Sequence, residues 1–285
     1  MNHYKIPVFI QNVHQLRRTH IAKFRKVIYS YYHTHSRKLP WRETSDPYRI
    51  LISEIMLQQT QVSRVLEKYV QFITQFPTIQ SLAGAPLKEI YTVWQGLGYN
   101  RRILYLQKTA QIVQQHYNGI IPSDVALLYK LPGIGKNTAS AIVVFAYNQP
   151  VVFIETNIRT VYIHFFAGNR EQILDTFLLP FIEGTLDRRN PREWYYALMD
   201  YGVMLKKEFP DIGRKSLHYS KQSSFEGSQR QIRGNILKCL QSHQKLTGKA
   251  LSELLHLDVQ KLNLVVEQLC NEKIIQKSGR SYFIP

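Results

Sequence analysis

Residues 131–139 read Leu-Pro-Gly-Ile-Gly-Lys-Asn-Thr-Ala, a tight turn followed by an apolar segment that runs on to Tyr147. Two glycines one residue apart permit backbone angles that other residues avoid, so successive amides of the turn can point outward. Such amides at the start of a helix form a seat for a phosphate group. An ordinary tight turn between helices is the alternative. The flanking Leu-Pro and Thr-Ala pairs favour a phosphate site formed by Gly133, Gly135, Lys136 and Thr138.

The rest of the chain reads as helices joined by short loops, without the alternation of strands and helices that would predict a parallel sheet. We therefore expect an all-α fold. Helical periodicity predicts one helix over residues 20–33 and a long one from Tyr48 to about Phe76. Further helices are expected over 101–117, over 123–130 with Ser123 as N-cap, and from Thr138 to Tyr147.

The C-terminal part has a different pattern. A polar stretch over residues 213–234 resembles a linker, and three short helices are expected over 236–240, 251–255 and 262–269. The tail then predicts a hairpin that turns at Ser278-Gly279. Three helices followed by a basic hairpin are typical of a winged helix, so we expect a winged-helix-like basic module over 229–285. A small helical cap on the main domain is the alternative.

Charge is the strongest compositional signal. The chain has 37 lysine and arginine residues against 20 acidic ones, for a formal net charge of +17. The excess lies at the ends, since residues 1–45 hold nine basic residues and one acid, and residues 205–285 hold fourteen and seven. Clustered cations favour a polyanionic partner over a merely soluble basic surface.

Several classes of protein are disfavoured. No apolar run approaches the roughly 18 residues of a membrane span, and we expect no signal peptide. We therefore expect a cytoplasmic protein, associated with the nucleoid if the source is bacterial, with no membrane partner. Cys239 and Cys270 are the only cysteines. This excludes a disulfide framework and a four-cysteine metal site, and we expect no metal ligands.

A second motif surrounds Glu54. On one continuous helix, Glu54, Gln58 and Gln61 would form a polar stripe at i, i+4 and i+7. The neighbours Ile55 and Met56 are apolar and predict a raised pKa for the Glu54 carboxyl, as suits a general acid or base. A solvated outer face is the alternative interpretation of a single glutamate.

Six motifs then occur in an order and spacing that resemble a known family. They are Leu39-Pro40-Trp41-Arg42, Asp46-Pro47-Tyr48, residues 53–61, Phe76-Pro77-Thr78, residues 94–99 and residues 131–139. Together they resemble the adenine glycosylases of the MutY type, relatives of endonuclease III within the helix-hairpin-helix DNA glycosylases. The resemblance covers about residues 37–204. It implies a six-helix barrel over 46–150 and a helical domain formed by 1–45 and 151–222, with DNA in the cleft between them.

The resemblance also implies roles for individual residues. Glu54 matches the catalytic glutamate, Glu155 occupies the place of the catalytic aspartate, and Asn157 matches the asparagine that supports it. The remaining matches concern the extruded base. Gln59 and Tyr99 match wedge residues, and the base pocket is expected to involve Trp41, Arg42, Gln58, Asn137 and Tyr196. A flipped base needs such a pocket and wedge, and cleavage of a glycosidic bond needs two carboxyl groups.

The chain departs from the family pattern at four places. Glu155 is one methylene longer than aspartate, and Asn137 stands where lyase-competent relatives have lysine. Lys206 stands where relatives supply the first cysteine of an iron–sulfur cluster, and no cysteine cluster follows. The resemblance does not extend to the nudix-like domain of the adenine glycosylases, so we expect the basic module over 229–285 in its place. The resemblance thus implies an enzyme without a cluster, and a monovalent cation at the hairpin is the only ion that we consider.

We therefore expect a monofunctional DNA N-glycosylase of base excision repair, a monomer that acts on duplex DNA with a damaged or mispaired base. Two alternatives stay open. One is a glycosylase for mismatched thymine or uracil on the same scaffold. The other is a catalytically inactive protein that recognises lesions or sites, which the replacement at Glu155 would allow.

Overall fold

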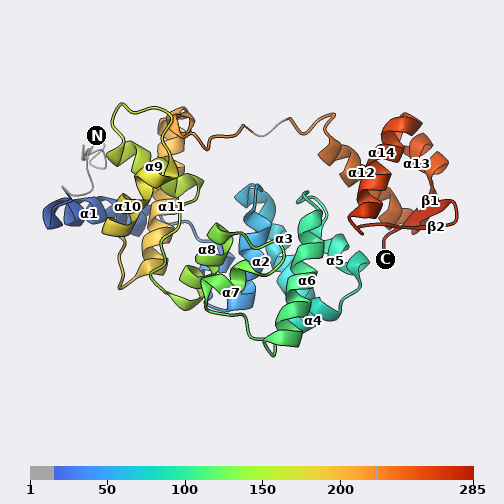
Figure 1. Ribbon diagram of the computed structural model, residues 1–285, viewed down its shortest axis with the longest axis horizontal. Helices are drawn as coiled ribbons and strands as arrows, with labels where there is room; N and C mark the ends of the chain where they lie inside the picture. The colour runs from blue at the N-terminus through green and yellow to red at the C-terminus, as the bar shows by residue number, and fades with distance from the viewer. Residues whose placement is uncertain (1–15, 222–223) are drawn as a thin grey trace. The chain divides into compact units, whose positions relative to one another are not determined.

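The computed structural model describes residues 16–221 and 224–285, and it is mostly helical, as expected (Figure 1). The described residues form two compact units: residues 16–47 with 135–221, and residues 48–134 with 224–285. Part of the basic N-terminal stretch, residues 1–15, lies outside the described residues. None of the helices in the described part of the chain is long and apolar enough to cross a membrane.

The first unit contains helices from both sides of the 48–134 segment. Its elements are α1 (Arg18–His35), η2 (Pro40–Arg42), α8 (Lys136–Tyr147), α9 (Thr156–Phe166), α10 (Asp175–Thr185), α11 (Pro191–Glu208) and η3 (Ile212–Lys215). Aromatic side chains form its core. Phe24 of α1 makes edge-to-face contacts with Tyr162, Phe165 and Phe166 of α9 and with Trp194 of α11. Such contacts stabilise the packing of the three helices beyond simple area burial.

Helices α9 and α11 approach each other closely at Gly202. A Cβ atom added to Gly202 would lie 2.3 Å from the carbonyl oxygen of Asn157, so any larger residue would push the helices apart. The glycine therefore lets the backbone of α11 touch the first turn of α9. This contact fixes the surroundings of Glu155 and Asn157.

The first part of the second unit consists of six short helices. They are α2 (Pro47–Leu57), α3 (Val62–Gln75), α4 (Ile79–Gly84), α5 (Leu87–Trp94), α6 (Arg101–His116) and α7 (Val125–Tyr129). Phe72 of α3 and Trp94 of α5 are both fully buried and meet edge to face. Asp124, and not the expected Ser123, caps α7, because its side chain accepts a hydrogen bond from the Leu127 amide.

The single long helix expected from Tyr48 to Phe76 is wrong. The helix is interrupted between Leu57 and Val62, and Gln59 adopts a left-handed backbone with φ 53°. The cause is the buried guanidinium of Arg102, which occupies the carbonyl groups at the end of α2. It donates hydrogen bonds to the carbonyl oxygens of Ile55, Met56 and Gln58 at 2.8, 3.0 and 2.8 Å. These are carbonyls that a longer helix would have used itself.

The C-terminal module, residues 224–285, contains three helices and a small sheet. Its elements are α12 (Gln229–His243), β1 (Lys245–Thr247), α13 (Gly248–Leu255), α14 (Val259–Asn271), β2 (Gln276–Ser278) and β3 (Ser281–Phe283). The antiparallel sheet has the order β1-β3-β2, with Ser278 opposite Ser281 at the hairpin and Gly279 in a left-handed conformation. The three helices and the hairpin agree with the expectation, and β1 is additional. The expected linker ends early, because α12 begins at Gln229.

The division into units differs from the expected domains in two respects. Helix α8 groups with the first unit instead of the barrel segment, and the C-terminal module groups with residues 48–134. The expected domain limits at 46–150 and 151–222 thus stay a prediction.

Candidate functional site

Glu155 is the N-cap of α9, and its side chain folds back onto the first turn of that helix. Its Oε1 accepts hydrogen bonds from the backbone N–H groups of Asn157 and Ile158 at 2.8 and 2.9 Å. Its Oε2 accepts a bond of 3.3 Å from Asn157 Nδ2. Aspartate is the usual acidic N-cap, and the fold-back lets the longer glutamate serve the same purpose. Donors and the positive end of the helix dipole hold a carboxylate in a fixed position here.

Asn137 supports the same segment from the other side. Its Nδ2 donates a hydrogen bond of 2.7 Å to the carbonyl oxygen of Ile154, the residue that precedes Glu155. Asn137 lies in the first turn of α8, directly after the turn of residues 131–135. The start of α8 is therefore tied to the segment that carries the candidate carboxylate.

Lys206 of α11 reaches this group as well. Its Nζ donates a hydrogen bond of 2.7 Å to Asn157 Oδ1. Burial lowers the pKa of Lys206, an effect that Glu155 opposes and Arg159 reinforces. Sequence reasoning noted Lys206 only as the replacement of a cysteine and gave it no part in the site. No local sequence signal indicates this contact, because it depends on α11 meeting α9 at Gly202, four residues before Lys206.

Trp41, Arg42 and Tyr196 form a second cluster within the first unit. The guanidinium of Arg42 makes two hydrogen bonds of 2.8 Å to the carboxylate of Asp200 and lies 4.6 Å from the ring centroid of Tyr196. Tyr196 stacks in turn on Phe145, with the ring centroids 4.5 Å apart. Trp41, Arg42 and Tyr196 are largely buried. Their expected part in a base pocket stays a prediction.

The turn of residues 131–135 precedes α8, and its expected part in binding a phosphate stays a prediction. Gly133 has φ 76°, and a Cβ atom there would lie 2.7 Å from the Cβ of Tyr105, so both backbone and space demand glycine. Gly135 has an ordinary φ of −79° and is the N-cap of α8. Lys136 and Asn137 are the first two residues of α8, where backbone N–H groups point out of the helix start. Gly133, Gly135 and Lys136 are exposed, and Thr138 is half-buried.

The carbonyl groups of the same turn accept hydrogen bonds from the protein. Pro132 O accepts from Thr109 Oγ1 at 2.8 Å, and Gly133 O accepts from Gln58 Nε2 at 3.3 Å. A carbonyl oxygen has two lone pairs, so each can still contact a cation. The monovalent cation at the hairpin stays a prediction.

Glu54 lies on α2, half-buried beside the buried side chains of Ser53, Ile55 and Met56. The expected stripe of Glu54, Gln58 and Gln61 on one helix is wrong, because α2 ends at Leu57 and Gln61 is the N-cap of α3. Gln58 points instead to Gly133. The raised pKa expected for Glu54 stays a prediction.

The two candidate wedge residues, Gln59 and Tyr99, lie on adjacent loops of the second unit. Both have a left-handed backbone, with φ values of 53° and 49°. This conformation is costly for residues other than glycine and often marks functional loops. Arg102 connects the two loops. Besides Gln58 O, it donates to the carbonyl oxygens of Leu97 and Gly98 at 3.2 and 3.0 Å.

Sequence reasoning missed Arg102, although a signal was present. Arg102 lies on the buried face of α6 with Leu106, Ala110 and Val113, at helical spacing. A single charge on an otherwise apolar face predicts a buried partner. Burial lowers the pKa of Arg102 to about 10, so its side chain stays charged near neutral pH.

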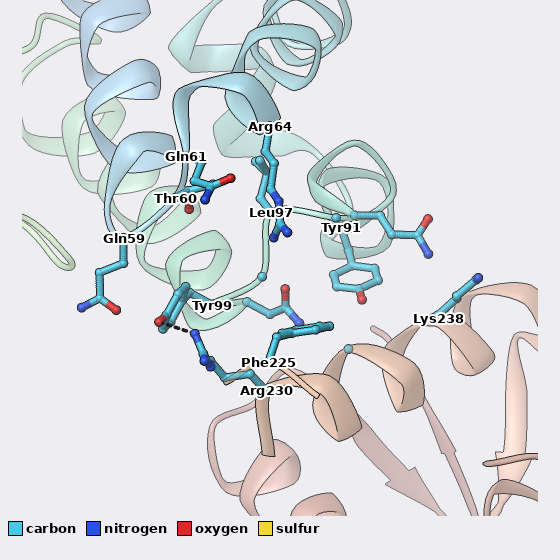
Figure 2. A pocket seen from close by; sticks show the side chains of 15 residues that line it. Gln59, Thr60, Gln61, Arg64, Tyr91, Leu97, Tyr99, Phe225, Arg230 and Lys238 are labelled. Carbon is cyan, nitrogen blue, oxygen red and sulfur yellow. Dashed lines mark hydrogen bonds between the residues drawn. The ribbon is translucent and has the colours of Figure 1, made fainter. Parts of the chain in front are cut away.

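A cavity of about 610 Å³ opens beside these loops (Figure 2). Figure 2 shows Gln59, Tyr99 and Arg64 at its edge together with Phe225 and Arg230 of the C-terminal module. Arg230 Nη1 donates a hydrogen bond of 2.8 Å to the hydroxyl of Tyr99. Aromatic rings and cations in one cavity suit a nucleotide, because bases stack on rings and phosphates pair with cations.

The candidate residues thus fall into two groups. Trp41, Arg42, Asn137, Glu155, Asn157 and Tyr196 belong to the first unit, and Glu54, Gln58, Gln59, Tyr99 and Gly133 belong to the second. Each group has its own carboxylate. Over residues 16–221 and 224–285, no group of three or more His, Cys, Asp or Glu side chains could hold a metal ion.

Comparisons with known proteins place the chain among DNA repair proteins. Residues 52–176 match the HhH-GPD superfamily of base excision DNA repair proteins. The chain is 40% identical over 184 residues to the adenine DNA glycosylase of Buchnera aphidicola subsp. Baizongia pistaciae, covering 64% of this chain and 52% of that protein. It is 30% identical over 239 residues to the adenine DNA glycosylase of Mycobacterium tuberculosis, covering 75% of this chain and 77% of that protein.

Solved structures agree on the fold. A thermostable thymine-DNA glycosylase superposes with a TM-score of 0.57 and 27% identity, covering 64% of this chain and 88% of that one. An endonuclease III in a trapped covalent intermediate with DNA superposes with a TM-score of 0.52 and 20% identity, covering 74% and 92%. The chain spans about half the length of the Buchnera adenine DNA glycosylases that it matches.

Proposed function

Because the chain belongs to the HhH-GPD superfamily of base excision DNA repair proteins, we propose that it is a monofunctional DNA N-glycosylase. It binds double-stranded DNA as a monomer, extrudes a damaged or mispaired base and releases that base by hydrolysis. Adenine is the first candidate for the released base, since the adenine DNA glycosylases are the relatives at 30–40% identity.

The observation that carries this proposal is the fixed carboxylate of Glu155. Hydrolysis of a glycosidic bond passes through an oxocarbenium-like sugar, and a carboxylate held in place stabilises the positive charge as it develops. Two backbone N–H groups and the Asn157 amide hold the Glu155 carboxylate, so little reorganisation is needed in the transition state. Asn157 supports the carboxylate, and Asn137 anchors the preceding peptide.

Glu54 is proposed as the second carboxyl group, the acid that protonates the leaving base. A half-buried glutamate among apolar neighbours suits this role, because desolvation favours the neutral carboxylic acid. Gln59 and Tyr99 are proposed to fill the space that the extruded nucleotide leaves in the base stack. Trp41, Arg42, Gln58 and Tyr196 are proposed to contact the extruded base.

The DNA backbone is proposed to bind at two places. The exposed amides of the turn, with Gly133, Gly135, Lys136 and Thr138, suit one phosphate group. The basic C-terminal module suits further phosphates as a winged-helix-like unit. Its exposed hairpin carries Lys277 and Arg280, with Lys245 on the neighbouring strand. The order of helices and strands in the module supports this interpretation.

An iron–sulfur cluster does not fit this chain. Four thiolates hold such a cluster, and the sequence has only Cys239 and Cys270, both in the C-terminal module. The last turn of α11 offers Lys206 and Lys207 instead, and the short helix η3 follows it. An ion pair and a hydrogen bond to residues 171–173 hold that segment: Lys215 pairs with Glu171, and the Ile173 amide donates to Lys215 O.

A second candidate activity is the release of thymine or uracil opposite guanine. The likeness to a thermostable thymine-DNA glycosylase favours it. The same two carboxyl groups would serve, and only the contacts to the base would differ. An inactive DNA-binding protein is a third possibility that the same experiment excludes or supports.

The test is a panel of duplexes that carry single mismatches or lesions. Each duplex is incubated with the full-length protein under single-turnover conditions, and alkali then cleaves any abasic site. We expect strand breaks at one base type, and Glu54→Gln should lower that rate by at least about 100-fold, the contribution of a general acid, with DNA affinity unchanged. No break on any duplex would contradict the proposed activity, and activity of Glu54→Gln near that of the wild type would remove Glu54 from the mechanism.

A further inference from the structure

Lys206 lies where two helices are in backbone contact. Gly202 of α11 touches the carbonyl group of Asn157 in the first turn of α9, and Lys206 follows one helical turn later on α11. Residues four apart lie on the same helix face, so Lys206 also faces the start of α9. The packing of α11 against α9 therefore places the ammonium group beside Asn157.

The ammonium group determines which way the Asn157 amide points. Lysine has three donors and no acceptor, so its 2.7 Å bond requires the oxygen Oδ1 of Asn157. The nitrogen Nδ2 must then face the opposite way, where it donates to Glu155 Oε2 at 3.3 Å. A flipped amide would direct Oδ1 at the carboxylate, and two acceptors would repel each other. The chain Lys206–Asn157–Glu155 therefore has one favourable arrangement.

Other charged groups near Lys206 leave this arrangement intact. Arg159, on the next turn of α9, is held by Asp175 through hydrogen bonds of 2.6 and 2.8 Å. His218 Nε2 lies 3.9 Å from the same Asp175 carboxylate. Glu155 is the acid that raises the pKa of Lys206 against the effect of burial. The positive charge of Lys206 therefore interacts with Asn157 and Glu155 at the start of α9.

We propose that Lys206 is a positioning residue for base release, which acts through the Asn157 amide to hold the Glu155 carboxylate. The proposal rests on the proposed function in one respect, namely that Glu155 stabilises the reacting sugar. It gives a role to a lysine that stands where relatives supply a cluster cysteine. The orientation of the amide, and not a new contact with DNA, is what the lysine contributes.

The experiment compares three variants of the full-length protein. Lys206→Met keeps the length of the side chain and removes the donor, Lys206→Arg keeps a donor, and Lys207→Met changes the adjacent exposed lysine as a control. We expect Lys206→Met to lower the single-turnover rate at saturating DNA by about 10- to 100-fold, as for loss of a charge-assisted hydrogen bond in a preorganised site. Its DNA Kd should stay within about twofold, because the Glu155 carboxylate that Lys206 positions stabilises the transition state and not the bound DNA. Lys206→Arg should recover most of the rate.

A double-variant cycle separates positioning from general stability. If Lys206 acts through Asn157, then adding Lys206→Met to Asn157→Ala should change the rate no further. Additive losses, or a rate of Lys206→Met equal to that of the wild type, would overturn the proposal. So would a fall in rate and rise in Kd that Lys207→Met reproduces.

A second measurement does not depend on activity. In ¹⁵N-labelled protein, the Nδ2 protons of Asn157 should exchange with water more slowly than those of the exposed Asn118, and Lys206→Met should accelerate their exchange. Equal exchange at Asn157 and Asn118 in the wild type would overturn the proposal even if Lys206→Met does not fold. Failure of the wild type to release any base would instead refute the proposed function, and the exchange result would still decide whether Lys206 orients the amide.

Discussion

Arg102 donates a hydrogen bond of 2.8 Å from Nη1 to the carbonyl oxygen of Gln58, across the gap between α6 and the end of α2. The same guanidinium bonds to Leu97 O and Gly98 O on the loop that leads to Tyr99. Both loops with left-handed backbone therefore depend on one buried cation. The wedge role proposed for Gln59 and Tyr99 requires loops that hold their shape against stacked bases, and a shared anchor suits that requirement.

The first prediction concerns this anchor. Arg102→Met should lower the free energy of unfolding by about 3 kcal/mol or more, because several buried carbonyl groups lose their donor at once. Arg102→Lys should recover only part of the loss, since a single ammonium group cannot reach acceptors on both loops. Urea denaturation measures both changes, with Lys108→Met on the exposed face of α6 as control. Equal stability of Arg102→Met and the control would contradict the anchoring role.

The second prediction concerns pH and the carboxylate of Asp200, whose side chain is 1% exposed. Burial raises its pKa, but hydrogen bonds and charges from Arg42 and Arg37 outweigh burial and lower the pKa below the ordinary value. A lowered folded-state pKa adds stability that is present above the unfolded pKa, near 4, and is lost as the pH falls through the folded pKa. The wild type should therefore lose stability below about pH 4.

Asp200→Asn tests that assignment. At pH 7 it should cost about 3–5 kcal/mol, because the largely buried Arg42 loses its counter-ion. The difference between variant and wild type should shrink toward pH 3, where the wild-type carboxyl also takes up a proton. Urea denaturation at both pH values checks this, and Asp211→Asn, which alters an exposed carboxylate, should have little effect. A constant difference at pH 7 and pH 3 would argue against the lowered pKa.

The third prediction is that borohydride traps no covalent adduct between the protein and DNA. Formation of a Schiff base needs an amine, and Asn137 offers an amide that is already bonded to Ile154 O. Denaturing gels of protein, abasic duplex and borohydride give the readout. An adduct that disappears in Lys136→Met would overturn the monofunctional assignment, and one that disappears only in Lys206→Met would assign the amine to α11.

The fourth prediction concerns the exposed cations of the C-terminal hairpin. Changing Lys245, Lys277 and Arg280 together to glutamine should weaken DNA binding and lower the slope of log affinity against log salt by about 2.7, if each meets one phosphate. The single-turnover rate at saturating DNA should stay within about twofold, because none of the three is a candidate for the chemistry. Binding titrations at several salt concentrations give the slope. An unchanged slope would mean that the hairpin serves a partner other than DNA.

The residues that sequence patterns predicted well are those with local causes. The glycine turn before α8 and the Ser278-Gly279 hairpin follow from backbone preferences of a few adjacent residues, and the structure has both. The break after Leu57 could not be predicted in the same way. Its cause, Arg102, is 45 residues away in the sequence, and apolar periodicity simply continues through the break.

The same distinction applies to the candidate site. The contact between Lys206 and Asn157 depends on two helices that meet at Gly202. No pattern of neighbouring residues predicts this contact. The sequence did indicate that the carboxylate of Glu155 needs a different position or conformation from that of aspartate, because the side chain is one methylene longer. The side chain folds back onto its own helix, because the amides of Asn157 and Ile158 donate to it, and these hydrogen bonds cannot be predicted from composition.

The last prediction concerns that folded side chain. If the chain is an enzyme, the Glu155 carboxylate must face the sugar of the extruded nucleotide, where positive charge develops. The position of this carboxylate is set by the amides of Asn157 and Ile158, which the full length of glutamate reaches. Glu155→Asp keeps a good N-cap but withdraws the charge, so the rate should fall by about 10- to 100-fold with the stability of α9 retained.

Glu155→Gln should cost more, about 100- to 1000-fold, because it removes the charge at nearly constant shape. Single-turnover rates of the wild type and both variants, measured on the best duplex of the panel, give the comparison. An inactive DNA-binding protein would behave differently: Glu155→Gln would change nothing, and Glu155→Asp would create activity by restoring the residue of the relatives. Activity that appears only in Glu155→Asp, from a wild type without activity on any duplex, would therefore refute the enzyme and identify the methylene as the inactivating change.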